Sequence, residues 1–113
     1  STGLYVPEEL GGLSVSKFRD AVSAEGARCG RGCNNPLHLH HMLNEADLYG
    51  DGKPTRIAFA DRDLRQPAGS LPVTEALPER CYSVPWFKHD RRDEIDQYVA
   101  AFRKVIEQAD QLL

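Results

Sequence analysis

The chain has little cysteine, no long apolar run and no excess of positive charge, and each shortage excludes a class of protein. Three cysteines in 113 residues are too few, and odd in number, for the disulfide framework of a small secreted domain. No apolar run approaches the roughly 20 residues that cross a bilayer, and no signal-peptide pattern opens the chain. We therefore expect a cytoplasmic protein with no membrane partner. A net charge of -3, with Lys and Arg scattered along the chain, argues against nucleic acid as a partner.

Length and composition predict one folded domain that covers residues 1–113. A hydrophobic content of 41% and a charged content of 27% are ordinary for a globular protein, and a chain of this length can bury a modest core. The sequence starts at Ser1 without an initiator Met and enters an apolar segment at residues 4–6 almost at once. We therefore expect a domain excised from a longer protein.

Two segments have clear helical patterns. Ser14 is a good N-cap and Gly26 a good C-terminal stop for a helix over residues 15–25, which has apolar side chains at helical spacing. The last helix is predicted to begin at Asp90 as its N-cap. It carries a near-continuous apolar stripe over residues 95–112, which must lie along a sheet or another helix.

Weaker patterns complete the architecture. Residues 49–70 form a long polar stretch, and loops of this length usually act in function or pack on a partner. Shorter strands and helices are predicted at residues 4–6, 27–33, 41–47, 72–80 and 81–85. The order is then strand, helix, strand, long loop, short helix, strand and long helix. This order predicts an α+β two-layer sandwich, with a small antiparallel or mixed sheet and helices packed on one face.

Residues 29–41 hold two of the three cysteines and three of the four histidines. Cys29, Cys33, His38 and His40 are ligand types that zinc accepts, so a small stand-alone zinc module is one possible function. In a strand, however, the two cysteines would share a face yet lie roughly 13 Å apart, too far to hold one ion. We therefore assign no metal ligand and keep the zinc module as the alternative.

His38 and His40 alternate with Leu37 and Leu39. In an extended segment this alternation gives one apolar, packed face and one face with two imidazoles. Imidazoles suit contact with anionic or hydroxyl-rich substrates, while a structural hydrogen bond is the competing role. We take His38 and His40 as the candidate substrate-binding residues.

Five segments, taken in order, resemble the C-terminal part of the DegT/StrS family, the fold type I pyridoxal-phosphate sugar aminotransferases. They are residues 36–40 (Pro-Leu-His-Leu-His), 47–58 (Asp-Leu-Tyr-Gly-Asp-Gly-Lys-Pro-Thr-Arg-Ile-Ala), 69–76 (Gly-Ser-Leu-Pro-Val-Thr-Glu-Ala), 82–89 (Tyr-Ser-Val-Pro-Trp-Phe-Lys-His) and 101–105 (Ala-Phe-Arg-Lys-Val). Each motif alone is weak, but the ordered set covers nearly the whole chain.

The resemblance implies the C-terminal small domain of an aminotransferase for a keto sugar, nucleotide-linked sugar or cyclitol. The expected partner is the large domain that binds pyridoxal phosphate, in a parent enzyme that is a homodimer. Lys17, Lys53, Lys88 and Lys104 do not match the family's cofactor-lysine motif, so no cofactor-binding or catalytic residue is expected here, and the chain alone should be inactive. The small domain would close the cleft and contribute substrate contacts, with the family's histidine carried onto His38.

Overall fold

The computed structural model describes residues 1–47, 50, 63 and 65–113. They form two compact units, which we call the core unit (Ser1–Cys33 with Leu77–Leu113) and the histidine unit (Asn34–Ala76). Within the described residues, no helix has both the length and the apolar character needed to cross a membrane.

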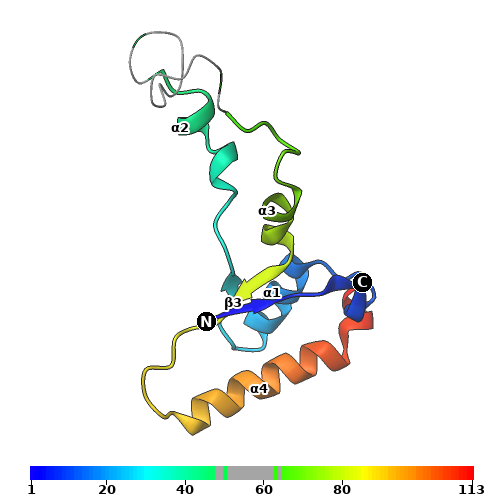
Figure 1. Cartoon of the computed structure of the whole chain (residues 1–113). Coiled ribbons are helices and arrows are strands. Elements are labelled where there is room, and N and C mark those ends of the chain that lie inside the picture. Colours follow the sequence, from blue (N-terminus) through cyan, green and yellow to red (C-terminus); the bar gives the residue numbers. More distant parts are fainter. Residues whose placement is uncertain (48–49, 51–62, 64) are drawn as a thin grey trace. The chain divides into compact units, whose positions relative to one another are not determined.

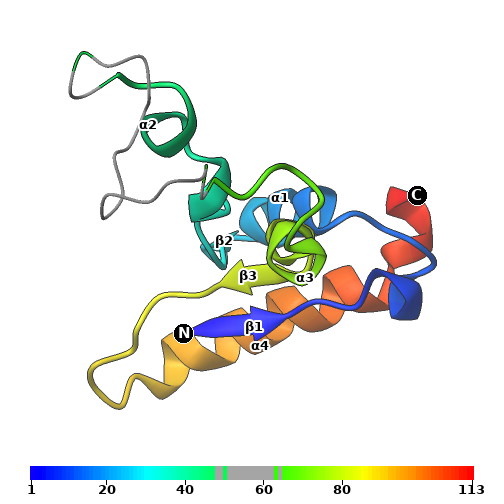
Figure 2. The same cartoon turned by 45° about the horizontal axis from the view of Figure 1, so that its top comes forward.

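The core unit is built on a small antiparallel sheet. Strand β3 (Cys81–Ser83) lies between β1 (Thr2–Leu4) and β2 (Gly30–Arg31), as Figure 2 shows. Tyr82 of β3 is directly opposite Gly3 of β1. A Cβ atom on Gly3 would overlap the ring of Tyr82, so the close approach of this ring requires glycine at position 3.

Two helices pack on the face of the sheet to which Tyr82 points. Phe18, from α1 (Val15–Ala24), has its ring centroid 5.9 Å from that of Tyr82. The ring centroid of Phe102, from α4 (Arg92–Glu107), lies 5.6 Å from that of Tyr82. Figure 1 shows both helices. The fold is therefore α+β with a small antiparallel sheet and helices on one face, as the sequence predicted.

A single apolar cluster fills the space between these helices and the sheet. Tyr5 is the one member with a hydroxyl, and this hydroxyl donates to the backbone oxygen of Leu13 over 2.6 Å, which removes the cost of burying it. The buried members are Tyr5, Leu13, Val15, Phe18, Val22, Ala27, Ala101, Val105 and Ala109.

The signals at both ends of α1 act as the sequence predicted. The side chain of Ser14 accepts a hydrogen bond from the backbone N–H of Lys17 over 3.3 Å, as an N-cap does. Gly26 has a φ of 90°, which turns the chain away from the helix axis at little steric cost. The predicted helix over residues 15–25 is confirmed.

The strand predicted at residues 27–33 is much shorter than expected. Of residues 27–33, only Gly30 and Arg31 pair with β3. The backbone N–H of Ala27 donates to the last turn of α1, and that of Cys29 donates to the side chain of Ser23. These residues are held against the end of α1 and cannot join the sheet.

The predicted capping of the last helix by Asp90 is wrong. Helix α4 begins at Arg92, and the residue at its N-cap is Arg91, which makes no side-chain capping bond. Asp90 lies one residue too early and accepts a hydrogen bond from the side chain of Arg92 over 3.3 Å. Acidic side chains in the first turn of α4 interact favourably with the positive end of the helix dipole and so stabilise a helix start that has no side-chain cap.

The histidine unit contains short helices only among its described residues. The helical turn predicted at residues 41–47 is present as α2 (His41–Asn44). The helix predicted at residues 72–80 is divided into α3 (Pro72–Ala76) and the 3-10 helix η3, because Pro78 has no N–H to continue an α-helix. Most of the predicted loop at residues 49–70 lies outside the described residues. Among the residues that the structure describes in either unit, the 3-10 helices are η1 (Pro7–Leu10), η2 (Leu37–Leu39), η3 (Leu77–Glu79) and η4 (Ala109–Leu112).

Candidate functional site

The candidate site in the histidine unit is centred on His38. Its Nε2 atom lies 3.0 Å from Oε1 of Glu75, so the contact joins η2 to α3 across a long stretch of sequence. The side chain of His38 is 10% exposed and that of Glu75 is 21% exposed. An ionised carboxylate at this distance accepts a charge-assisted hydrogen bond from the imidazole N–H.

Glu75 also binds the backbone that leads into its own helix. Its carboxylate accepts from the N–H of Gly69 at 3.0 and 2.9 Å and from the N–H of Leu71 at 3.1 Å. The hydrogen bond from Gly69 is the largest cause that lowers the pKa of Glu75, and the hydrogen bond from His38 lowers this pKa further. The Glu75 side chain is therefore ionised at neutral pH, and it accepts hydrogen bonds from the His38 ring and from the backbone N–H groups of Gly69 and Leu71.

Sequence reasoning missed Glu75 as a part of the site. The available signal was its place in the Pro-Val-Thr-Glu segment, three residues after Pro72, where an acidic side chain often returns to the backbone N–H groups before a helix. Its second bond, to His38, depends on a tertiary contact that no local pattern encodes.

The predicted arrangement of the two histidines is wrong in its local geometry. Residues 37–39 form the 3-10 helix η2 and not an extended segment. Leu37 is exposed, whereas His38 is largely covered, so the expected apolar face and imidazole face do not exist. The cause is Pro36, whose fixed φ starts a tight turn in which side chains do not alternate across two faces.

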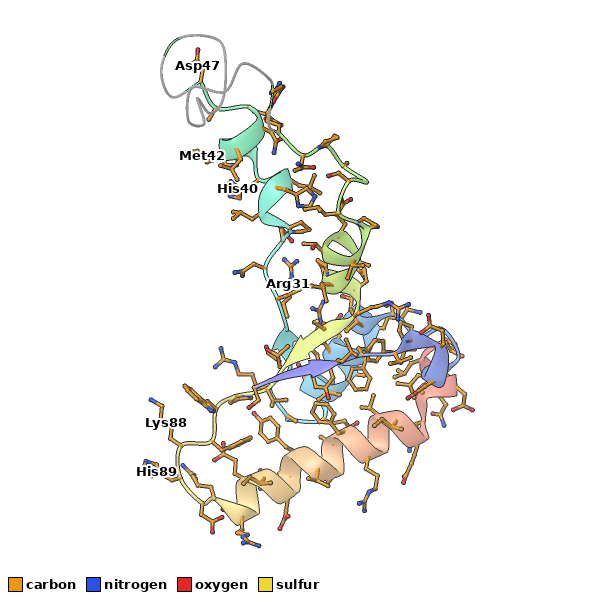
Figure 3. The ribbon with its side chains drawn as sticks, in the orientation of Figure 1. Arg31, His40, Met42, Asp47, Lys88 and His89 are labelled. Carbon is orange, nitrogen blue, oxygen red and sulfur yellow. The ribbon has the colours of Figure 1, made fainter. Side chains whose placement is uncertain are left out.

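His40 serves first as a helix cap. Its Nδ1 atom accepts a hydrogen bond from the backbone N–H of Met42 over 3.3 Å, which caps α2 in place of a serine or aspartate. Figure 3 shows His40 and Met42 at this turn. The side-chain amide of Asn44 donates to the backbone oxygens of both His38 and His40, at 2.6 and 3.0 Å. Asn44 therefore fixes the backbone that carries both histidines.

A second feature is an apolar groove in the core unit, along the side of α4. Its volume is about 470 Å³. Val99 and Ile106 are each 48% exposed there, although the sequence pattern predicted that this stripe would be covered. The charged residues that line it are Arg103 and Glu107. The apolar residues are Val84, Phe87, Ile95, Tyr98, Val99, Phe102 and Ile106.

The cysteines are free thiols. Burial raises the pKa of the Cys29 thiol. Burial also raises the pKa of the Cys81 thiol, and the neighbouring Cys33 thiol raises it further. Within the described part of the chain, no group of three or more His, Cys, Asp or Glu side chains is placed to hold a metal ion.

The described lysines do not fit the cofactor that the family resemblance implies. The ammonium of Lys17 donates to the last two backbone carbonyls of the chain, and that of Lys104 pairs with Glu25 at 2.7 Å. Lys88 is exposed on the segment before α4, as Figure 3 shows, and Lys53 lies outside the described residues. A lysine in an enclosed site is needed to hold pyridoxal phosphate, and none of the described lysines lies in such a site.

Comparison of the chain with protein-family models, with curated proteins and with solved structures gives no match.

Proposed function

We propose that the chain is the C-terminal small domain of a pyridoxal-phosphate-dependent aminotransferase of the DegT/StrS type. Its substrate would be a keto sugar, a nucleotide-linked sugar or a cyclitol. The domain would close the active-site cleft and contribute substrate contacts, without catalysis by itself. As part of the same proposal, the enzyme acts in the cytoplasm.

The observation that carries this proposal is the hydrogen bond between His38 and Glu75. Each residue belongs to one of the segments that resemble the family, residues 36–40 and 69–76. No local pattern predicts that these two segments meet. Their contact at one polar point supports a common role for both, and a polar site of this kind is what a substrate with many hydroxyl groups requires.

The proposed partner of the core unit is the large, cofactor-binding domain of the same enzyme, which would act as a homodimer. The apolar groove along α4 supports this part of the proposal, because exposed apolar surface of this kind marks an interaction site. Trp86, at 81% exposed, adds a large aromatic side chain of the type that anchors interfaces.

The proposal is tested by the reading frame that encodes the chain. We expect sequence upstream of Ser1 to encode a larger domain with a cofactor lysine. The full-length product should show the visible absorbance of a lysine-bound cofactor, and borohydride should remove this absorbance. A reading frame without such a domain would refute the proposal.

The role of His38 is tested in that full-length product with His38→Gln. We expect KM for the keto substrate to rise by about 10-fold, equivalent to the loss of one hydrogen bond of about 1.4 kcal/mol, with unchanged cofactor absorbance. His89→Gln is the matched control, because His89 is exposed on the segment before α4. Equal kinetics for the two variants would remove His38 from the substrate site.

A further inference from the structure

We infer that Glu75 is a positioning residue, which holds the imidazole of His38 with Nε2 as the N–H donor and so presents Nδ1 as a hydrogen-bond acceptor for a ligand hydroxyl. The identity of that ligand rests on the proposed function. The orientation and tautomer of the imidazole do not, and they can be measured on this chain alone.

The position of the proton follows from the chemistry of the pair. The backbone donors at Gly69 and Leu71 lower the pKa of Glu75, so its carboxylate is ionised at neutral pH and can only accept hydrogen bonds. The 3.0 Å contact between Nε2 of His38 and Oε1 of Glu75 then requires a proton on Nε2. In a neutral imidazole the other nitrogen, Nδ1, carries a lone pair and accepts.

The orientation of the ring is fixed from both sides. Glu75 is itself held by the N–H groups of Gly69 and Leu71, so its carboxylate is a fixed point for the imidazole to contact. On the other side, Asn44 holds the backbone oxygen of His38 over 2.6 Å. A side chain anchored by backbone and ring together is preorganised, which lowers the entropy cost of ligand binding.

This geometry also selects the chemical class of the ligand group. A neutral imidazole that offers a lone pair at Nδ1 binds a group that donates, such as a sugar or cyclitol hydroxyl. Of the substrate groups in the proposed class, a ring hydroxyl is the one that can donate to this lone pair.

The test is nuclear magnetic resonance of the ¹⁵N-labelled chain at a pH about two units above the ordinary imidazole pKa of about 6.5. The two ring nitrogens of each histidine are compared, with exposed His89 as the internal reference. We expect His38 to show a protonated Nε2 and an unprotonated Nδ1, and to exchange its Nε2 proton at least 10-fold more slowly than His89. Loss of signals in His38→Gln assigns the ring.

Glu75→Ala should bring the nitrogen shifts of His38 to those of His89 and remove the slow exchange. Glu75→Gln keeps the side-chain volume and should have a smaller effect of the same sign, which keeps the test valid if the alanine variant does not fold. Glu79→Gln is the matched control, because Glu79 is exposed and its replacement should leave His38 unchanged. A proton on Nδ1, or nitrogen shifts unaffected in both Glu75 variants, would overturn the inference.

A double-mutant cycle in the full-length enzyme tests whether Glu75 acts through His38. We expect His38→Gln, Glu75→Gln and the double variant to raise KM by similar factors, because all three break one unit. Fully additive effects would contradict the inference. If the full-length protein has no aminotransferase activity, the proposed function and the assignment of the ligand fail, while the tautomer measurement decides the positioning by Glu75 independently.

Discussion

Replacement of Phe18 gives the sharpest test of the core unit. The Phe18 side chain is 3% exposed, and its ring lies among three other aromatic rings. The ring centroids are 5.0 Å away for Tyr5, 5.9 Å for Tyr82 and 5.7 Å for Phe102. The side chain therefore joins the N-terminal segment, the sheet and α4 at one point.

The size of the effect follows from these contacts. Phe18→Ala loses a buried aromatic side chain and leaves a cavity, which costs about 3–5 kcal/mol of unfolding free energy. Phe18→Leu keeps most of the apolar volume but loses the ring contacts, each worth about 0.5–1.5 kcal/mol. Because the three contacts share one side chain and do not add fully, we expect about 1.5–3 kcal/mol for the leucine variant.

Urea unfolding, followed by near-ultraviolet circular dichroism of the tyrosines, measures these changes. With a slope of about 1–3 kcal/mol per molar urea, a loss of about 2 kcal/mol lowers the midpoint by about 1 M. Ser16→Ala, at an exposed position of the same helix, is the control and should be neutral or slightly stabilising. A cost below about 1 kcal/mol for Phe18→Ala would refute the core as described.

Three further predictions concern the surface, the carboxylate of the candidate site and a buried thiol. The 113-residue chain should self-associate through the groove along α4, because each half-exposed side chain there offers about 1 kcal/mol on full burial. The double variant Val99→Lys with Ile106→Lys should be a monomer, and a wild-type monomer at high concentration in sedimentation would contradict the prediction. Because the pKa of Glu75 is lowered from its ordinary value of 4.5, its stabilisation is complete above that value and lost as the pH falls through the lowered pKa. The protection of its backbone donors, which is their amide exchange rate relative to the intrinsic rate at the same pH, should fall in acid in the wild type and stay unchanged in Glu75→Gln. Cys81 should be alkylated more slowly than Cys33, because Cys81 is buried and its pKa is raised; equal rates by mass spectrometry would count against the described burial.

The parts of the fold that the sequence predicted correctly are those with local causes. Helix α1 is marked by Ser14 at one end and Gly26 at the other, and both signals act within a few residues of where they stand. The α+β class follows from the order of elements, which depends on many weak patterns and survives an error in one of them. The length of β2 could not be predicted, since it is limited by the bond from Cys29 to Ser23.

The groove along α4 shows a different limit. The sequence predicts the apolar stripe of this helix, but an apolar pattern indicates only that a face avoids water. It does not state which protein surface covers the face. In the core unit the part that contains Ala101 and Val105 is buried, whereas Val99 and Ile106 remain half-exposed. The stripe is therefore wider than the intramolecular contact needs, and this excess is the basis for the partner that we propose.

The candidate site was found from the sequence by residue type, but its construction was not. The alternation with leucine and the family resemblance predict His38, yet the alternation indicates an extended segment where Pro36 starts a 3-10 turn. No local pattern predicts the contact of Glu75 with His38, because the two residues are 37 positions apart in the chain. The hydrogen bond between His38 and Glu75 joins residues 36–40 and 69–76 into one structural unit. A substitution at Gly69, where φ is 86°, should therefore displace the Glu75 carboxylate and, through it, the His38 imidazole. Gly69→Ala is strained at this φ, and we expect it to shift the ring nitrogens of His38 as Glu75→Ala does, whereas Gly12→Ala, at a φ of 89° in the core unit, should destabilise the chain without this shift.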